Sequence, residues 1–271
     1  MTYQTISIRQ DGPVDWLTLN RPDRLNTITG RMVEELCGYF DGLKQDYGVR
    51  IVVMRGAGRG FCAGLDIKEH QHGERMDGGG GTLHPGYPLF DIVKLMRDCP
   101  QPIVALLHGP VCGGGMGFAL AADIRIAGES MRMNDAFVAL GRSGCELGVT
   151  YFLPRIVGLG IATELMYTGA FIGAARAKEV GLVNKVSADD DMEAAAAEYL
   201  EPMLRTAPLG LRMTKQTLNR ALRVNDLLAV MDLEWHAQEV CGGGPDFDEA
   251  MNAFIEKRSA RYTLPDRRTS A

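Results

Sequence analysis

The chain has 271 residues, of which 46% are hydrophobic and 23% charged, a composition typical of folded rather than disordered or fibrous proteins. It carries 29 lysines and arginines against 34 aspartates and glutamates, a net charge of -5, so its charge does not favour a nucleic-acid partner. Six cysteines occur without CxxC pairs or nearby histidine clusters, which argues against a disulfide framework and against a metal site of the zinc type.

Neither the first residues nor the longest uncharged segment of the sequence predicts export or a membrane span. The first residues, MTYQTISIRQDG, contain no basic segment and no long apolar stretch, so we expect no secretory or transit peptide and a cytoplasmic protein. The uncharged window 102–122 is about long enough to cross a bilayer. Its prolines, His108 and a glycine triplet divide it into a strand, a turn and a helix start, so we expect a buried strand and no membrane partner.

The first half of the chain alternates strand and helix patterns. Residues 14–19 alternate as a strand does, residues 50–58 form a β-branched run ending in glycine, and residues 31–46 between them have helical spacing. The segments that follow are a strand and turn in PIVALLHGP, a helix in MGFALAA and a strand in DIRIAGE. This alternation of strands and helices predicts an α/β fold with largely parallel strands.

The second half is predicted to be mostly helical, because apolar residues recur at helical spacing from Tyr151 onward. No low-complexity linker separates the halves. We therefore expect an α/β core over residues 1–200, a helical region over 201–262 that packs across subunits, and a polar tail over 263–271. Four consecutive glycines between Glu69 and Phe90 predict a flexible loop, either a plain surface excursion or an adjustable wall of a substrate pocket.

Two segments share one design, an apolar strand, a glycine-rich turn and a helix: residues 54–69 and residues 107–123. Each turn leaves backbone N–H groups near a helix N-terminus, where the peptide dipoles add positive potential. If the turns converge, they form an oxyanion hole, in which each donor is worth roughly 2.7–4 kcal/mol. Each turn alone is also explained as a tight turn. Neither GxGxxG, GxxxxGK[ST] nor GxSxG occurs, which weighs against dinucleotide binding, a phosphate loop and a serine hydrolase.

Four segments taken together resemble the crotonase superfamily, the enoyl-CoA hydratase/isomerase enzymes: LNRPDRLNTIT, GAGRGFCAGLDIKE, HGPVCGGGMGFALAADIRIA and LGVTYFLPRIVGLGIATELMYTG. The resemblance extends from about Thr5 to Tyr262. It implies a spiral of ββα units and a homotrimer or dimer of trimers built with the C-terminal helices. It also implies an acyl-CoA thioester as the substrate, with coenzyme A as part of the substrate and no separate cofactor.

The resemblance assigns roles to individual residues. It implies that the backbone N–H groups of Cys62 and Gly114 are the two oxyanion donors, so the Cys62 thiol need not react. The substrate would also contact the rest of this motif, Ala63, Gly64 and Leu65. Coenzyme A would contact Arg24, Leu25, Phe254 and Lys257, the last two sometimes from a neighbouring subunit. A solvated turn residue and an exposed helix face are the alternatives for Arg24 and Lys257.

The sequence departs from the family at the two acids of a hydratase. The first acid position is Gly117, and the second falls on Phe137 or Val138, depending on where a one-residue gap is placed. Two carboxylates normally hold and activate the water that adds to the double bond, so their absence counts against the standard hydratase mechanism.

Another acid, Glu146, matches the position where dienoyl-CoA isomerases and 4-chlorobenzoyl-CoA dehalogenases of this family carry a functional aspartate. Its apolar neighbours would raise a carboxyl pKa and suit proton transfer near neutral pH, unless Glu146 is an exposed acid at a helix start. Asp135 is a second candidate for the catalytic acid. Strand alternation could point its side chain away from the site, so a turn or cap role is favoured for it. Asp66 is expected to cap a helix, and His108 to be structural, although it could line the pocket.

We therefore expect an acyl-CoA enzyme that stabilises a thioester enolate and uses Glu146 as its acid/base. Double-bond isomerisation is slightly favoured, because one carboxylate can carry a proton between two carbons. A hydratase in which Glu146 handles the water is close behind, and dehalogenation is less favoured. An acyl-CoA binding protein without catalytic activity is the alternative from another class.

Overall fold

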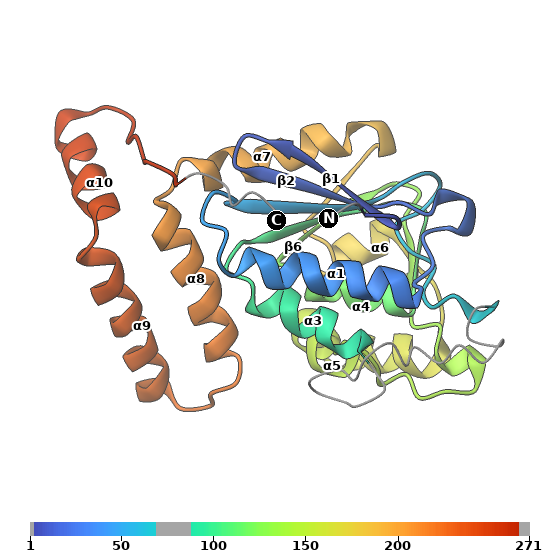
Figure 1. Ribbon diagram of the computed structural model, residues 1–271. Helices are drawn as coiled ribbons and strands as arrows, with labels where there is room; N and C mark the ends of the chain where they lie inside the picture. Colours follow the sequence, from blue (N-terminus) through green and yellow to red (C-terminus); the bar gives the residue numbers. More distant parts are fainter. Residues whose placement is uncertain (1–2, 69–87, 266–271) are drawn as a thin grey trace.

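The computed structural model describes residues 3–68 and 88–265. A six-stranded sheet lies at its centre, in the order β1-β2-β3-β4-β6-β9 (Figure 1). β1 pairs with β2 antiparallel, and every other pair in this sheet is parallel. The strands are β1 (Ile6–Asp11), β2 (Val14–Leu19), β3 (Ile51–Gly56), β4 (Ile103–Leu107), β6 (Ile124–Gly128) and β9 (Lys185–Ser187).

A second, three-stranded sheet lies beside the first and carries one of the two glycine turns. Its strands are β5 (Pro110–Cys112), β7 (Arg132–Asn134) and β8 (Ile172–Gly173), with β7 in the middle. β5 pairs with β7 in parallel, so Cys112 lies opposite Asn134. The chain leaves β5 directly into the glycine triplet.

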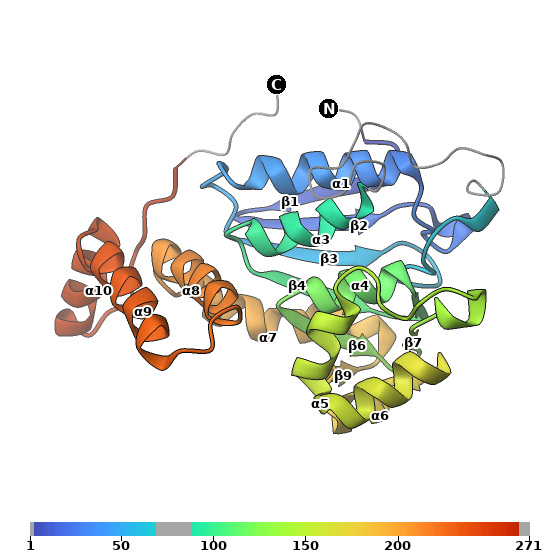
Figure 2. The same ribbon diagram turned by 90° about the horizontal axis from the view of Figure 1, so that it is seen from below.

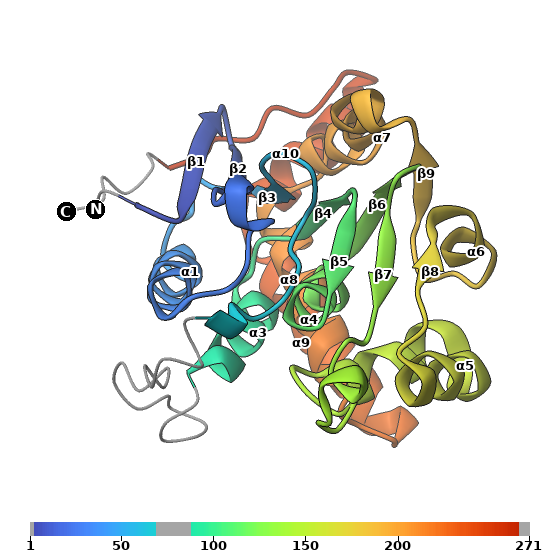
Figure 3. The same ribbon diagram turned by 90° about the vertical axis from the view of Figure 1, so that its right-hand side faces the viewer.

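Helices cover both faces of the six-stranded sheet. α1, α3 and α4 lie on one face and α7 on the other (Figure 3). The helices are α1 (Gly30–Leu43), α3 (Leu89–Asp98), α4 (Gly114–Ala121), α5 (Val149–Thr168), α6 (Ala174–Glu179), α7 (Met192–Leu204), α8 (Pro208–Ala221), α9 (Leu227–Gly242) and α10 (Pro245–Glu256). Three short 3-10 turns are η1 (Pro22–Arg24), η2 (Val138–Leu140) and η3 (Asp189–Asp191).

The strand β4 shows how the sequence fills both layers. All five of its residues are buried. Ile103, Ala105 and Leu107 pack on the side of α1, α3 and α4, whereas Val104 and Leu106 pack on the side of α7. A parallel strand covered on both faces has no polar side, which is why its sequence is continuously apolar. Burial of each large side chain contributes about 1.5–3 kcal/mol.

The last three helices, α8, α9 and α10, project from this core, and we call them the C-terminal arm (Figures 1 and 2). Two buried cations of α8 attach the arm to the core. Arg212 donates to the carbonyl oxygens of Asp46 and Val49, and Lys215 donates to those of Met96 and Gln101. These bonds connect α8 to backbone carbonyl groups at the edge of the core.

α5 has the length and apolar composition of a helix that could cross a membrane, and 28% of that window is buried. Core helices of other proteins pass the same test. Gly158 has φ 78° and ψ 160°, so it divides α5 into two shorter helical pieces. Neither piece reaches the roughly 20 residues needed for a span.

The predicted α/β fold with a helical C-terminal region is confirmed. β1 was not predicted, and β8 and β9 lie within the half predicted to be mostly helical. The expected boundary at residues 200 and 201 lies inside α7. Most of the predicted glycine loop lies outside the described residues.

Candidate active site

The two glycine turns lie against each other. The N–H of Cys62 donates to the carbonyl of Pro110 at 3.1 Å, and the N–H of Cys112 donates to the carbonyl of Cys62 at 2.9 Å. A Cβ on Gly115 would lie 2.3 Å from the Cys62 carbonyl oxygen, closer than real Cβ atoms approach. Gly115 therefore allows the start of α4 to pack directly on the turn that follows β3.

Two backbone N–H groups lie close together at this junction. Gly114 is the first residue of α4, and its N–H has no hydrogen-bond partner within the described part of the chain. The same holds for Leu65, whose neighbours Gly64 and Asp66 make the backbone bonds to Ile28. A Cβ on Gly64 would lie 3.6 Å from the Gly114 nitrogen, so the two turns present adjacent donors. The N-terminus of α4 adds positive potential there.

The assignment of Cys62 as an oxyanion donor needs correction. Its N–H is already bonded to Pro110, so it cannot also be directed at a substrate oxygen. The free N–H of the motif belongs to Leu65, three residues later. The thiol is equally unsuited to chemistry, because complete burial raises the pKa of Cys62 to about 12.

Leu147 fills the space beside Gly117, the position that the family resemblance gives to the first acid of a hydratase. A Cβ on Gly117 would lie 2.7 Å from the Cβ of Leu147, so no side chain fits at position 117. The same leucine extends over the oxyanion turn, because a Cβ on Gly114 would lie 3.3 Å from its Cδ1. Leu147 itself has a φ of 49°, an uncommon conformation for a non-glycine residue. The absence of an acid at position 117 is therefore linked to the presence of Leu147, because the leucine leaves no space for a side chain there.

The second acid position is also apolar. Phe137 is buried, and its ring carbons would lie 3.6–3.7 Å from a Cβ on Gly113. Val138 lies on the far side of this turn, against Gly169. Neither residue can transfer a proton.

Glu146 directly precedes Leu147 and lies three residues before α5 begins. Only 9% of the residue is exposed, so it is not the solvated acid that a helix start would allow. Arg142 lies 3.6 Å from Oε1, and the backbone carbonyl of Glu146 accepts from the N–H of Val149 at 2.9 Å. This tight turn fixes the backbone of Glu146 next to the leucine that covers the oxyanion glycines.

Asp135 is a buried carboxyl that the sequence placed in a turn. Its Oδ1 accepts a long bond of 3.4 Å from the N–H of Phe137, as a turn residue would. The residue is 0% exposed, however, and its Oδ2 has no partner among the described residues. Burial, together with the charge of Glu146, raises the pKa of Asp135 from 3.8 to about 6. A Cβ on Gly144 would lie 2.8 Å from Oδ2, so the carboxyl lies under the loop that leads to Glu146.

Asp66 and His108 have structural contacts. Asp66 Oδ2 accepts from Arg21 at 3.1 Å and from Thr27 at 2.9 Å, which connects the first glycine turn to the RPDRLNT segment. His108 Nε2 lies 2.8 Å from the carbonyl oxygen of Gly58. These contacts hold the turns around the two free N–H groups.

The residues expected to contact coenzyme A fall into two places. The N–H of Ala63 donates to the carbonyl of Leu25 at 3.0 Å, so Leu25 lies beside the oxyanion turn, and Arg24 next to it is exposed. Phe254 and Lys257 are exposed at the end of α10, which lies far from α1 and α4 (Figure 1). One chain does not bring these two groups together.

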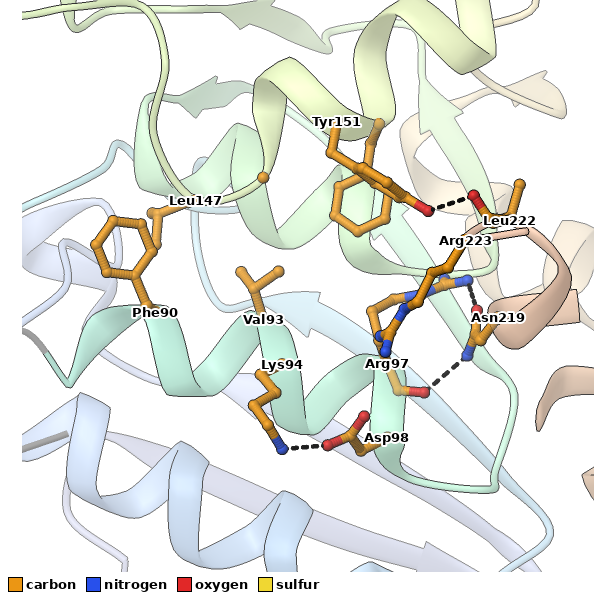
Figure 4. A pocket seen from close by; sticks show the side chains of 12 residues that line it. Phe90, Val93, Lys94, Arg97, Asp98, Leu147, Tyr151, Asn219, Leu222 and Arg223 are labelled. Carbon is orange, nitrogen blue, oxygen red and sulfur yellow. Dashed lines mark hydrogen bonds and ion pairs between the residues drawn. The ribbon is translucent and has the colours of Figure 1, made fainter. Parts of the chain in front are cut away.

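A pocket of about 560 Å³ begins beside Leu147 and runs between α3, the start of α5 and the end of α8 (Figure 4). Its walls near Leu147 are apolar, and its far end carries charged side chains. Sequence reasoning missed this pocket because its lining comes from three segments that are distant in the chain. In the described part of the chain, no group of three or more histidines, cysteines or acids is placed to hold a metal ion.

Comparison with known proteins gives a consistent result. A family model described as enoyl-CoA hydratase/isomerase matches residues 9–265. The 1,2-epoxyphenylacetyl-CoA isomerase of Escherichia coli K12 is 35% identical over 251 residues, covering 91% of this chain and 94% of the isomerase. The short-chain-enoyl-CoA hydratase of Clostridium acetobutylicum is 32% identical over 260 residues, covering 95% and 97%. The crystal structure of an enoyl-CoA hydratase from Bacillus anthracis matches with a TM-score of 0.89 and 32% identity, covering 96% and 99%.

Proposed function

The chain belongs to the enoyl-CoA hydratase/isomerase family, and from this premise we propose that it moves a double bond within an acyl-CoA thioester. The protein is an enzyme of this family that acts on acyl-CoA. One observation supports isomerisation. Apolar residues, Leu147 and Phe137, lie at the two positions that the family resemblance gives to a hydratase's acids, which leaves Glu146, the buried acid directly before Leu147, as the candidate carboxylate.

In this proposal the thioester oxygen accepts hydrogen bonds from the N–H groups of Gly114 and Leu65. The carboxylate of Glu146 removes a proton from C2 of a 3-enoyl thioester, and the electron pair moves into a dienolate. The same carboxylic acid then returns the proton to C4, which gives the 2-enoyl product with no net change in atoms. The two donors stabilise the enolate oxygen, where negative charge develops.

Hydration of a 2-enoyl thioester is the second candidate, and Asp135 is the observation that favours it. A hydratase needs two groups, one to activate water and one to deliver a proton to C2. Asp135 is a second buried carboxyl close enough to Glu146 for their charges to interact. Enone absorbance separates the two reactions, because hydration consumes the conjugated enone of a 2-enoyl thioester and isomerisation of a 3-enoyl thioester forms it.

The test uses a panel of 2-enoyl- and 3-enoyl-CoA thioesters, followed by enone absorbance and by exchange of the α-proton in D2O. Glu146→Gln is expected to lower kcat by roughly 10²–10⁴-fold, the usual contribution of a general acid/base. Glu129→Gln removes an exposed carboxylate and serves as the matched control, with no expected change. Unchanged turnover in Glu146→Gln would refute the role of Glu146, and binding without either signal would indicate an acyl-CoA binding protein.

We also propose that copies of the chain assemble through the C-terminal arm, as a trimer or a dimer of trimers. α9 has no buried residue, and Leu227, Met231 and Trp235 form a stripe at spacings of four with exposed fractions of 72%, 51% and 67%. A groove of about 660 Å³ between α8 and α9 adds to this apolar surface. Such an area on a protein surface favours association with another chain.

Assembly would also complete the coenzyme A site. Phe254 lies on α10 and Lys257 caps its end, and α10 is far from α1 and α4 (Figure 1), so in this proposal they meet a coenzyme A that is bound to a neighbouring copy. Phe254 is exposed and positioned at the end of its helix for such a contact.

A further inference from the structure

The pocket beside Leu147 has two chemically different ends (Figure 4). The near end is formed by Phe90, Val93 and Leu147, whose side chains offer hydrocarbon surface. The ring of Phe152 lies farther along, with its centroid 5.6 Å from the Arg97 guanidinium. Leu147 lines the pocket and also contacts the oxyanion turn through the glycine position 114. An acyl chain that leaves a thioester held at Gly114 therefore enters this end of the pocket.

The far end holds more positive than negative charge. Lys94 pairs with Asp98. Arg97 and Lys215 both pair with the single carboxylate of Asp123, at 2.9 Å and 3.0 Å. These three cations thus share two anions, which leaves one positive charge without its own counter-ion.

Arg223 adds a further cation to this end. In the described part of the chain its guanidinium makes neither a hydrogen bond nor an ion pair, and it extends toward Arg97 (Figure 4). The turn that carries it is fixed, because the hydroxyl of Tyr151 donates to the carbonyl of Leu222 at 3.0 Å. The pocket is therefore lined by Lys94, Arg97 and Arg223, against the carboxylates of Asp98 and Asp123, which leaves one positive charge in excess. Lys215, buried behind the lining, shares Asp123 and adds a second.

We propose that this pocket binds the distal end of an acyl group that terminates in a carboxylate. This inference rests on the proposed function, because it names the substrate class for the same site. A guanidinium presents paired N–H donors that match the two oxygens of a carboxylate. A carboxylate at the far end would balance part of the excess charge, and a methylene chain would fill the apolar near end. A methyl-terminated chain would leave Arg223 without a partner.

The experiment compares two 3-enoyl-CoA thioesters of equal chain length, one ending in a carboxylate and the other in its methyl ester. For the wild-type protein we expect kcat/KM for the carboxylate to exceed that for the ester about tenfold. The ratio should decrease as salt is added, because screening weakens the attraction. A ratio of one or below would overturn the inference while leaving the proposed function intact.

Arg223→Gln keeps much of the shape of the side chain and removes its charge. We expect its kcat/KM for the carboxylate to fall about tenfold more than that for the ester. Arg220→Gln, which changes an exposed arginine near the end of α8 and outside the pocket lining, is the control and should change neither value. Equal losses for both thioesters in Arg223→Gln would mean that Arg223 does not recognise the carboxylate.

A binding measurement separates this inference from the proposed function. Saturated acyl-CoA thioesters with the same two termini are titrated calorimetrically into the wild-type protein and Arg223→Gln. If neither enoyl thioester is turned over, the proposed function fails. A tighter Kd for the carboxylate that is lost in Arg223→Gln would still support the inference, and equal Kd values would overturn it.

Discussion

The α/β core and the C-terminal arm differ in how far their apolar side chains are buried. Every residue of β4 is buried, whereas α9 has no buried residue although its stripe of Leu227, Met231 and Trp235 is apolar. The core buries its apolar side chains within one chain, whereas the arm leaves apolar side chains of α9 in contact with water. This difference supports the proposal that another copy of the chain covers the arm.

The attachment of the arm to its core is polar. Arg212 and Lys215 of α8 donate to backbone carbonyl groups of the core, and Arg50 of the core donates to carbonyl groups just before the arm. These bonds orient the arm without using its apolar face. The candidate catalytic groups lie in the core and the proposed assembly surface lies in the arm, so substitutions can test each separately.

Among the substitutions that compare the core with the arm, the largest effect is expected where the two glycine turns meet in the core. In Gly115→Ala, the new Cβ would lie 2.3 Å from the Cys62 carbonyl oxygen, so the two turns must separate. The N–H groups of Gly114 and Leu65 would then no longer converge on one oxygen. We expect kcat to fall about 10²–10³-fold, the loss associated with one oxyanion donor.

Steady-state kinetics with a 3-enoyl-CoA thioester checks this prediction, and analytical ultracentrifugation checks that assembly is unchanged. Gly160→Ala in α5 is the control, because a Cβ there meets no atom within 4 Å. Full activity in Gly115→Ala would mean that the close contact between the turns is not needed for catalysis. A change in assembly would contradict the separation between core and arm.

Most of the core could be predicted from the sequence because its signals are local. The strand at Val14–Leu19 was predicted with the observed bounds, since it alternates over six residues. β1 was not predicted, because its outer residues are polar and the strand is recognisable only through its pairing with β2. β8 has two residues, too few to show any periodicity.

The site was predicted less completely, because it depends on contacts between distant segments. The convergence of the two turns was foreseen, but which N–H remains free depends on the bond between Cys62 and Pro110. Gly117 was identified as a departure from the family, yet its cause is Leu147, thirty residues later. The burial of Asp135 beside Glu146 has no sequence signal, since alternation alone gave it either face of the strand.

A smaller effect is expected in the arm. Trp235→Ala removes the largest exposed side chain of the apolar stripe on α9. If copies of the chain meet there, association should weaken by at least about 2 kcal/mol, the usual cost of losing an aromatic hot spot. Sedimentation velocity over a range of protein concentrations measures this change.

The matched control is Leu159→Ala, which removes a side chain of similar exposure (73%) from α5 in the core. It should leave the sedimentation profile unchanged. The thermal stability of the core should be the same in both variants at high dilution. Identical sedimentation of Trp235→Ala and the wild-type protein would show that the apolar stripe is not the assembly surface.

The smallest effect concerns the cost of one buried charge in the core. The pKa of Asp135 is raised from 3.8 to about 6, so the folded state holds a proton that the unfolded chain has already lost between these values. Folding stability therefore decreases as the pH rises from about 4 to 6, and the full cost remains above pH 6. Asp135→Asn carries no charge at any pH and escapes this cost.

We expect Asp135→Asn to be more stable than the wild-type protein by roughly 1–2 kcal/mol at pH 7.5, and nearly equal to it at pH 4. Urea unfolding at the two pH values measures the difference, with Asp190→Asn at an exposed position as the control. A stability gain that is the same at both pH values would mean that packing, not ionisation, distinguishes the variant. A stability gain confined to neutral pH, combined with lower turnover, would show that the Asp135 carboxyl lowers the stability of the core but contributes to catalysis.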